Sequence, residues 1–127
     1  MAADSSSRDV VARYVRALHE RDLDMIERLQ SPDYIEDYPQ SGERIRGRRK
    51  IQSSRAAQPN RKRFTVRRII GAGDLWVTEY VLTYDGRPSY TVSIMEFLDG
   101  KVARETQYFG DPFEPGPSRA QWVERMP

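Results

Sequence analysis

The chain has 127 residues, a net charge of +2, 38% hydrophobic and 31% charged residues, which is the composition of one soluble globular domain. It has no cysteine and one histidine, His19, which excludes disulfides and thiol catalysis and argues against a metal site or a Ser-His-Asp triad. No apolar run approaches the roughly 20 residues of a membrane span. The first residues lack a basic start followed by an apolar block, so we expect a cytoplasmic protein with no membrane partner.

The first half of the chain carries helical patterns. Residues 1–8 are expected to be a disordered N-terminus, and Ser7 can cap a first helix. The apolar stripe of this helix consists of Val11, Tyr14, Val15 and Leu18. A second helix is expected at Leu23–Leu29 and a third at Arg48–Ala57, with a short strand, Tyr34–Tyr38, between them.

Positive charge is concentrated between Glu43 and Arg68, where eleven basic residues accompany one acidic residue. Such a segment could attract nucleic acid or an anionic ligand, or it could be a solvated helix and edge strand. Aromatic residues do not interleave the basic ones, and Arg48, Arg49 and Lys50 are consecutive, so they fan around a helix axis. We therefore expect a solvated surface without specific nucleic-acid binding.

The second half alternates as antiparallel strands. The expected strands are Phe64–Ile70, Leu75–Tyr84, Thr91–Leu98 and Val102–Phe109. Asp85-Gly86 and Asp99-Gly100 are signals for tight hairpin turns, because glycine tolerates the positive φ that these turns need. The outer phase of Thr91–Leu98 is apolar and consists of Val92, Ile94 and Leu98. A monomer would expose this phase as a patch on the order of several hundred Å², so we predict a homodimer through the outer face of the sheet.

Helices followed by a run of strands, with one early strand between the helices, predict an α+β fold. We expect a cone-shaped roll in which a curved, mixed and mostly antiparallel sheet wraps around two or three N-terminal helices and encloses a pocket. This domain is expected to span residues 9–113. Pro112, Pro115 and Pro117 then break the chain into a tail, residues 114–127, which we expect to pack on the domain.

Three segments resemble the nuclear transport factor 2-like superfamily, and within it the SnoaL-like polyketide cyclase and ketosteroid isomerase branch. They are VVARYVRALHERDLDMIERL, DYIEDYP and VSIMEFLDGKVARETQYFGDPF, and the resemblance runs from Val10 to about Phe113. It implies the same cone-shaped fold and a dimer of the same kind. This superfamily contains isomerases, cyclases, dehydratases, epoxide hydrolases and non-catalytic binders, so the fold does not decide the function.

The isomerases imply three functional positions. The tyrosine in RYV, which donates to the substrate oxygen, is kept as Tyr14. The aspartate base before the proline is replaced by Tyr38, and Asp37 precedes it, on the opposite face of the strand unless a bulge intervenes. The buried, protonated aspartate is replaced by Met95, so we do not expect steroid isomerisation by that mechanism.

Glu105 is the main candidate for chemistry. The resemblance implies that Glu105, Gln107 and Phe109 line the pocket, where desolvation beside Met95 and Phe97 would raise the pKa of the carboxyl group. Such a group suits general acid or base catalysis, which SnoaL-like cyclases perform without metal or cofactor. The alternative is a structural ion pair with an arginine, and the candidates are Arg104 and Arg119.

The tyrosines are open to similar alternatives. Tyr14, Tyr38 and Tyr80 could form a donor cluster at a carbonyl or enolate oxygen, or fill the core with their hydroxyls on backbone carbonyls. The Asp-Arg-Asp relay of limonene epoxide hydrolase-like enzymes is not found at its spacing, although Arg104 next to Glu105 leaves a relay of this kind open.

We expect a SnoaL-like enzyme that moves a proton on a small hydrophobic carbonyl compound, by isomerisation, aldol-type cyclisation or dehydration, with no cofactor and no metal. The expected catalytic residues are Glu105, Tyr14 and Asp37. The expected ligand-binding residues are Tyr38, Trp76, Tyr80, Met95, Phe97, Gln107 and Phe109. The alternatives are a non-catalytic binding protein for a small apolar ligand and an interaction module. An open cavity with an unpaired Glu105 favours the enzyme, one with salt-bridged acids favours the binder, and a closed core favours the module.

Overall fold

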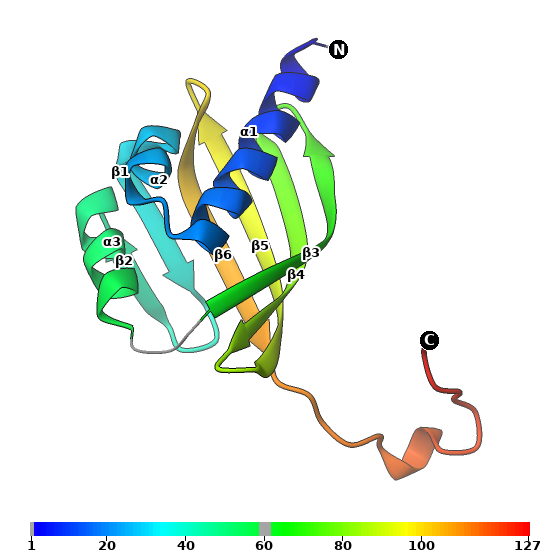
Figure 1. Ribbon diagram of the computed structural model, residues 1–127. Coiled ribbons are helices and arrows are strands. Elements are labelled where there is room, and N and C mark those ends of the chain that lie inside the picture. Colours follow the sequence, from blue (N-terminus) through cyan, green and yellow to red (C-terminus); the bar gives the residue numbers. More distant parts are fainter. Residues whose placement is uncertain (1, 59–61) are drawn as a thin grey trace.

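The computed structural model describes residues 2–58 and 62–127 of the chain. Within these residues, three α-helices and six β-strands form one layered unit (Figure 1). The helices are α1 (Ala2–Glu20), α2 (Leu23–Leu29) and α3 (Arg48–Ala57). The strands are β1 (Gln30–Tyr38), β2 (Glu43–Arg46), β3 (Lys62–Ala72), β4 (Leu75–Tyr84), β5 (Arg87–Leu98) and β6 (Lys101–Gly110).

The strands form a mixed sheet in the order β2-β1-β6-β5-β4-β3. Neighbouring strands are antiparallel, except that β1 and β6 are parallel. Both predicted hairpins are confirmed: Asp85 and Gly86 have φ angles of 52° and 84°, and Asp99 and Gly100 have φ angles of 51° and 76°. The parallel pairing joins the early strand to the last one, so residues from both ends of the domain become neighbours.

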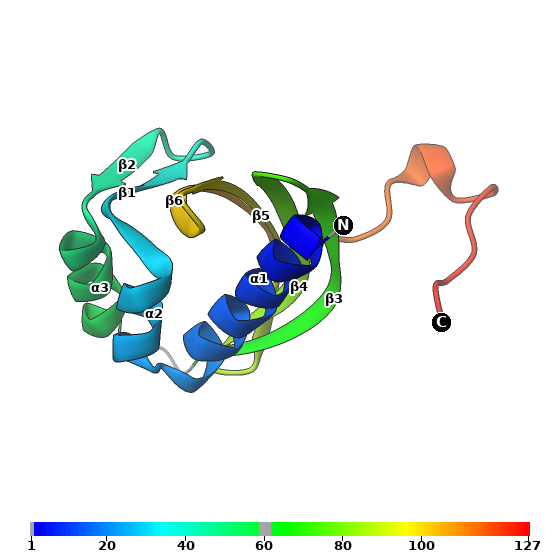
Figure 2. The same cartoon turned by 90° about the horizontal axis from the view of Figure 1, so that it is seen from above.

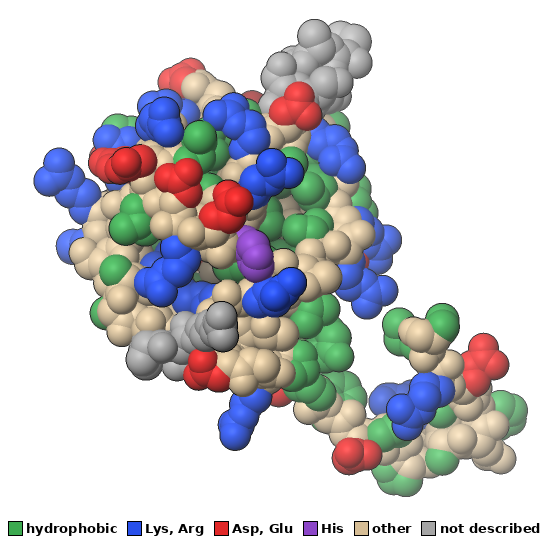
Figure 3. All heavy atoms as spheres, in the orientation of Figure 1, with side chains coloured by type: hydrophobic (Ala, Val, Ile, Leu, Met, Phe, Trp, Pro, Cys, Tyr) green, Lys and Arg blue, Asp and Glu red, His purple; other side chains and the backbone are tan. Residues whose placement is uncertain are grey.

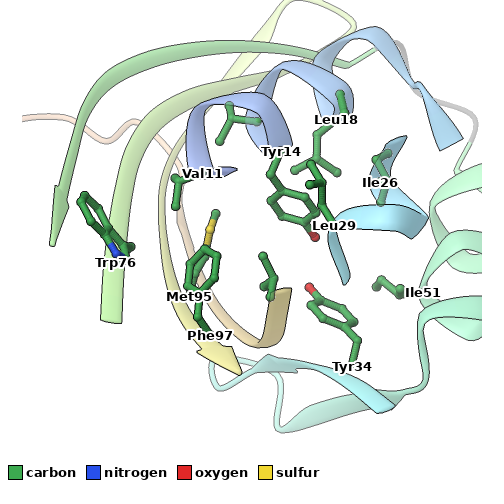
Figure 4. Close-up of a cluster of buried hydrophobic side chains, with 13 residues drawn as sticks. Val11, Tyr14, Leu18, Ile26, Leu29, Tyr34, Ile51, Trp76, Met95 and Phe97 are labelled. Carbon is green, nitrogen blue, oxygen red and sulfur yellow. The ribbon is translucent and has the colours of Figure 1, made fainter. Parts of the chain in front are cut away.

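The helices lie within the curve of the sheet (Figure 2). Helix α1 packs on β3 and β4, and α3 packs on β1 and β2. The predicted stripe of α1 is buried, and it meets the apolar side chains of the strands in one core (Figure 4). The expected α+β cone is therefore confirmed, with the apolar core between α1 and the middle of the sheet.

Several boundaries differ from the expectations. Helix α1 starts at Ala2, before the expected cap at Ser7, and β1 starts at Gln30, before the expected Tyr34. Strand β2 was not expected, because a strand of four residues with three charged ones carries little alternation. Its pairing with β1 comes from the turn that follows Tyr38.

The C-terminal tail extends away from the domain (Figure 1) and does not pack on it, contrary to the expectation for residues 114–127. Phe113 and Trp122 are 83% and 79% exposed. The prolines hold this segment extended, and its short 3₁₀ turn, Pro117–Arg119, contains no buried residue.

The outer face of the sheet exposes large apolar side chains, which are Ile70, Leu75, Tyr90, Leu98 and Tyr108. Val92 and Ile94 of the predicted outer phase are half-buried. On the helical side of the molecule, Lys and Arg side chains are interspersed with acidic ones (Figure 3). No helix in the described part of the chain has the length and hydropathy needed to cross a membrane.

Candidate functional site

Two carboxyl groups lie side by side in the interior. Glu36 of β1 pairs in register with Glu105 of β6, and both side chains are fully buried. Both are in phase with other buried residues of their strands, Tyr34 on β1 and Gln107 on β6, so both face the helices. A buried carboxyl group is costly unless hydrogen bonds or a counter-ion compensate for the lost water.

Glu105 accepts hydrogen bonds from three neutral donors. The hydroxyls of Tyr14 and Tyr34 reach its Oε1 at 3.0 and 2.7 Å, and the amide of Gln107 reaches its Oε2 at 3.0 Å. The amide of Gln30 donates in turn to the Tyr14 hydroxyl at 2.7 Å. Figure 4 shows the two tyrosine hydroxyls converging from α1 and β1. Burial raises the pKa of both tyrosines, so both remain protonated donors at neutral pH.

Arg55 of α3 supplies the positive charge of this cluster. Its Nη2 lies 3.4 Å from Glu36 Oε2 and 3.9 Å from Glu105 Oε1, and its side chain is only 16% exposed. Glu36 Oε2 also contacts the Tyr34 hydroxyl. Burial, together with the charge of Glu105, raises the pKa of Glu36 well above its ordinary value. The result is an acid-arginine-acid arrangement, which the linear spacing of the sequence does not display.

An open cavity of about 630 Å³ lies beside the cluster, and Arg55 and Gln107 belong to both. Two aromatic pairs line it: Tyr38 with Phe109, at a centroid distance of 6.1 Å, and Phe64 with Tyr80, at 5.4 Å. The first pair comes from β1 and β6, and the second from β3 and β4. The cavity therefore combines apolar ring surface with a polar wall that is backed by the buried acids.

The polar wall centres on the Gln107 amide. Its Nε2 lies 2.9 Å from the Tyr80 hydroxyl, 2.9 Å from Ser93 Oγ and 3.0 Å from Glu105 Oε2. An amide nitrogen has only two hydrogens, so these three acceptors compete for them. Tyr80 and Ser93 are also within 2.9 Å of each other, and burial raises the pKa of Tyr80 well above its ordinary value.

Lys62, at the start of β3, lines the same cavity. Burial, followed by the positive charges of Arg55 and Arg21, lowers the pKa of its amine to about 8. Two acidic residues, Glu43 and Asp111, also line the cavity. The described residues contain no group of three histidine, aspartate or glutamate side chains suited to hold a metal ion.

Four of the predicted ligand-binding residues line the cavity, and they are Tyr38, Tyr80, Gln107 and Phe109. The predicted catalytic residues Tyr14 and Glu105 are directly hydrogen-bonded but lie behind the cavity wall, where both are fully buried. Among the described residues, Glu105 pairs with neither Arg104 nor Arg119, and the arginine that pairs with it is Arg55.

The other predicted residues lie elsewhere. Trp76, Met95 and Phe97 belong to the apolar core (Figure 4) and are not among the residues that line the cavity. Trp76 shares the inner phase of β4 with Tyr80 but lies further along the strand, and none of the described residues that line the cavity comes from β5, which carries Met95 and Phe97. Asp37 lies on the outer phase of β1, as alternation indicated. Arg44 binds its two carboxylate oxygens at 2.6 and 2.9 Å and holds the pKa of Asp37 below its usual range.

Sequence reasoning missed Gln30, Tyr34, Glu36 and Arg55 as members of the cluster. For two of them a signal existed. Tyr34, Glu36 and Tyr38 alternate along the expected strand, so placing Tyr38 in the pocket implies an inward Glu36 as well. Arg55 stood in a segment interpreted as solvated, and Gln30 stood before the expected start of the strand.

Two comparisons identify relatives of this chain. Its residues 11–105 match the SnoaL-like domain family. A crystal structure of an NTF-2 like protein of unknown function from Burkholderia xenovorans LB400 is 48% identical, covers 97% of each chain and has a TM-score of 0.87. A proposed ketosteroid isomerase from Kribbella flavida DSM 17836 is 28% identical over 98% of this chain and 92% of the other, with a TM-score of 0.91. No curated protein matches the sequence.

More distant structures share the fold alone. One is a proposed SnoaL-like polyketide cyclase from Jannaschia sp. CCS1, 16% identical over 86% of this chain and 88% of the other, with a TM-score of 0.74. Another is an LEH-like epoxide hydrolase from M. tuberculosis, 21% identical over 84% of each chain, with a TM-score of 0.71. The family match over residues 11–105 covers most of the cone, and the chain therefore belongs to the SnoaL-like domain family.

Proposed function

We propose that this protein is a cofactor-free enzyme that moves a proton on a small hydrophobic carbonyl compound bound in the cavity. The reaction class is isomerisation, aldol-type cyclisation or dehydration, with Glu105 as the carboxylate that takes up or releases the proton. The observation that carries this proposal is a fully buried carboxylate, held by neutral donors, directly behind the wall of an open cavity. The names of two similar structures, a proposed ketosteroid isomerase and a proposed polyketide cyclase, support the same class.

The cost of the cluster supports a catalytic role over a purely structural one. Two carboxyl groups and a guanidinium that lose their water are expensive, and apolar residues of similar volume would stabilise a fold as well or better. Residues with strongly shifted pKa values are concentrated at functional sites, because catalysis needs buried ionisable groups that the stability of a fold does not need. Here Glu36, whose pKa is raised, and the hydrogen bonds around Glu105 lie next to the cavity.

Gln107 is the proposed connection between substrate and base. Its amide reaches Glu105 and also lines the cavity, and its two hydrogens serve three acceptors. A substrate oxygen that takes over the Tyr80 hydroxyl would let the amide turn and open Glu105 to the substrate. Tyr80 would then stabilise the negative charge that develops on that oxygen, as donors in an oxyanion hole do.

The second candidate is a binding protein that holds a small apolar ligand without reacting it. The observation that favours it is that neither carboxyl group lines the cavity and both form ion pairs with Arg55, which is the arrangement that the sequence analysis associates with a binding protein. The two candidates differ in one measurable property: only the enzyme accelerates the loss of a proton from bound ligand.

The test is exchange of α-hydrogens for deuterium in D₂O, followed by NMR on a panel of cyclic ketones, enones and β-diketones. Ligand-observed NMR first selects the compounds that bind. We expect wild type to accelerate exchange in at least one binding compound, and Glu105→Gln to lose about a hundredfold or more of that rate. The matched control is Glu96→Gln, on the exposed side of β5. No acceleration by wild type for any binding compound would favour the binding protein, and acceleration that Glu105→Gln retains would refute Glu105 as the base.

A further inference from the structure

One hydroxyl group stands between the two buried acids. Tyr34 Oη is 2.7 Å from Glu105 Oε1 and also in contact with Glu36 Oε2. A tyrosine hydroxyl has a single hydrogen to donate, so it cannot donate to two carboxylates at once. One of the two acids must therefore supply the second hydrogen of this chain, as a protonated carboxyl group that donates to the tyrosine oxygen.

The other contacts decide which acid is protonated. Glu105 accepts from Tyr14 and Gln107 in addition to Tyr34, so both of its oxygens are placed to accept. Glu36 accepts one long hydrogen bond, from Arg55 to its Oε2 at 3.4 Å, and its Oε1 is buried with no hydrogen-bond partner among the described residues. An anion is stabilised by donors and a neutral acid needs fewer of them, so the negative charge belongs on Glu105.

We propose that Glu36 and Glu105 form a two-carboxyl site that shares one proton through Tyr34, with Glu36 as the neutral acid and Glu105 as the anion. The raised pKa of Glu36, which burial and the neighbouring Glu105 cause, agrees with this assignment. Two like charges on adjacent strands in a dry interior also disfavour double ionisation. The charged and titratable groups around the pair are Arg55 from α3, Tyr14 from α1, Tyr80 from β4, and Tyr34, Asp37 and Tyr38 from β1.

Arg55 makes the proton movable. Its Nη2 lies 3.4 Å from Glu36 and 3.9 Å from Glu105, so the cation can serve a negative charge at either position. In the shift, the O–H bond of Glu36 breaks and its proton goes to Tyr34 Oη. The Tyr34 hydrogen passes at the same time to Glu105 Oε1. The net charge of the cluster and its number of protons stay the same.

This exchange gives Glu105 both of the states that an acid-base enzyme needs, and this consequence rests on the proposed function. As an anion, Glu105 can take a proton from a substrate. As the acid, with the charge transferred to Glu36, it can deliver one, and no water has to enter the site. Glu36 is thus a positioning residue that sets the protonation state of Glu105, and it does not touch the substrate.

The test is infrared difference spectroscopy of the folded protein at pH 7 in H₂O and D₂O, which detects the C=O stretch of a protonated carboxyl group and needs no substrate. We expect wild type to show this band and Glu36→Gln to lose it. Glu105→Gln should lose it as well, because Glu36 must then ionise to pair with Arg55. Glu96→Gln, an exposed carboxyl on β5, should keep it.

Each result of the infrared experiment either supports or overturns the shared proton. No band in wild type would overturn the proposal without the help of any variant, even if the variants fail to fold. A band that survives in Glu105→Gln would also overturn it, because Glu36 would then be neutral through its own burial and would share nothing with Glu105. Failure of the hydrogen-exchange test would refute the enzyme and leave this band in place, so the two proposals fail separately.

Discussion

Replacement of Arg55 by methionine tests the electrostatic account of the cluster most directly. Methionine keeps much of the length of the arginine stem and removes the charge that lies 3.4 Å from Glu36 and 3.9 Å from Glu105. The side chains of both acids are 0% exposed, so water cannot take over the role of the guanidinium without a rearrangement. The remaining anion is then buried without a partner of opposite charge.

The expected loss of stability follows from that imbalance. At an effective dielectric constant of about 20, a unit charge at 3.9 Å from a cation is stabilised by about 4 kcal/mol. Removing one partner of a buried ion pair costs about 3–5 kcal/mol in measured cases. We therefore expect Arg55→Met to lower the free energy of unfolding by about 3–5 kcal/mol at pH 7.

The loss should also depend on pH. The variant can relieve the buried charge by binding one more proton in the folded state than wild type does. Its free energy of unfolding then falls relative to wild type by about 1.4 kcal/mol for each pH unit of increase in that range. The penalty is accordingly smallest in acid and grows towards neutral pH.

Urea unfolding, followed by the fluorescence of the buried Trp76, measures this loss. For a slope of about 2 kcal/mol per molar urea, the midpoint should fall by about 2 M. The matched control is Arg44→Met, which removes an arginine that pairs with Asp37 on the outer face and should shift the midpoint far less. A shift in Arg55→Met no larger than in the control, or one that does not change with pH, would refute the account.

Three further predictions concern other features. The pKa of Glu36 is raised in the folded state, so the stabilisation by this group is complete below its ordinary pKa of 4.5 and is lost as the pH rises through the folded-state pKa. Urea titrations should therefore show that the stability of Glu36→Gln increases relative to that of wild type as the pH rises from 5 to 8. The amine of Lys62 should titrate near pH 8 in NMR spectra of labelled lysine side chains, and Lys62→Arg should remove that signal. The exposed outer face should make the protein a dimer in sedimentation at micromolar concentration, and Leu98→Lys should weaken it, whereas a wild-type monomer would contradict the prediction.

The fold could be predicted where its signals are local. The Asp-Gly turns fix the register of the hairpins they connect, and the stripe around Tyr14 fixes the face of α1 that is buried. The pairing of β1 with β6 could not be read in this way. It joins strands separated by most of the domain, and nothing near either strand in the sequence encodes which partner it takes.

The residues of the site could likewise be predicted only where a local signal marks them. Tyr38, Tyr80, Gln107 and Phe109 could be placed from alternation and from the resemblance, because each lies on a strand whose inward face was known. Arg55 could not be placed, because a helix rich in arginine carries no signal for which of its cations turns inward. In the structure it does so because the acids of β1 and β6 lie beneath α3.

Glu36 shows why a residue's phase and its chemistry have to be weighed together. Alternation along β1 puts Tyr34, Glu36 and Tyr38 on one face and Asp37 on the other, and the structure has this arrangement. A charged residue is by default expected outside, so the polarity of Glu36 gives no reason to place it in the pocket. Glu36 is nevertheless buried, because a second acid, Glu105, lies next to it on the neighbouring strand and is surrounded by hydrogen-bond donors. Alternation can thus place an acid on the inner face of a strand whose neighbour carries another inward acid. Such an arrangement indicates a functional pair of acids more strongly than it indicates an error in the predicted phase.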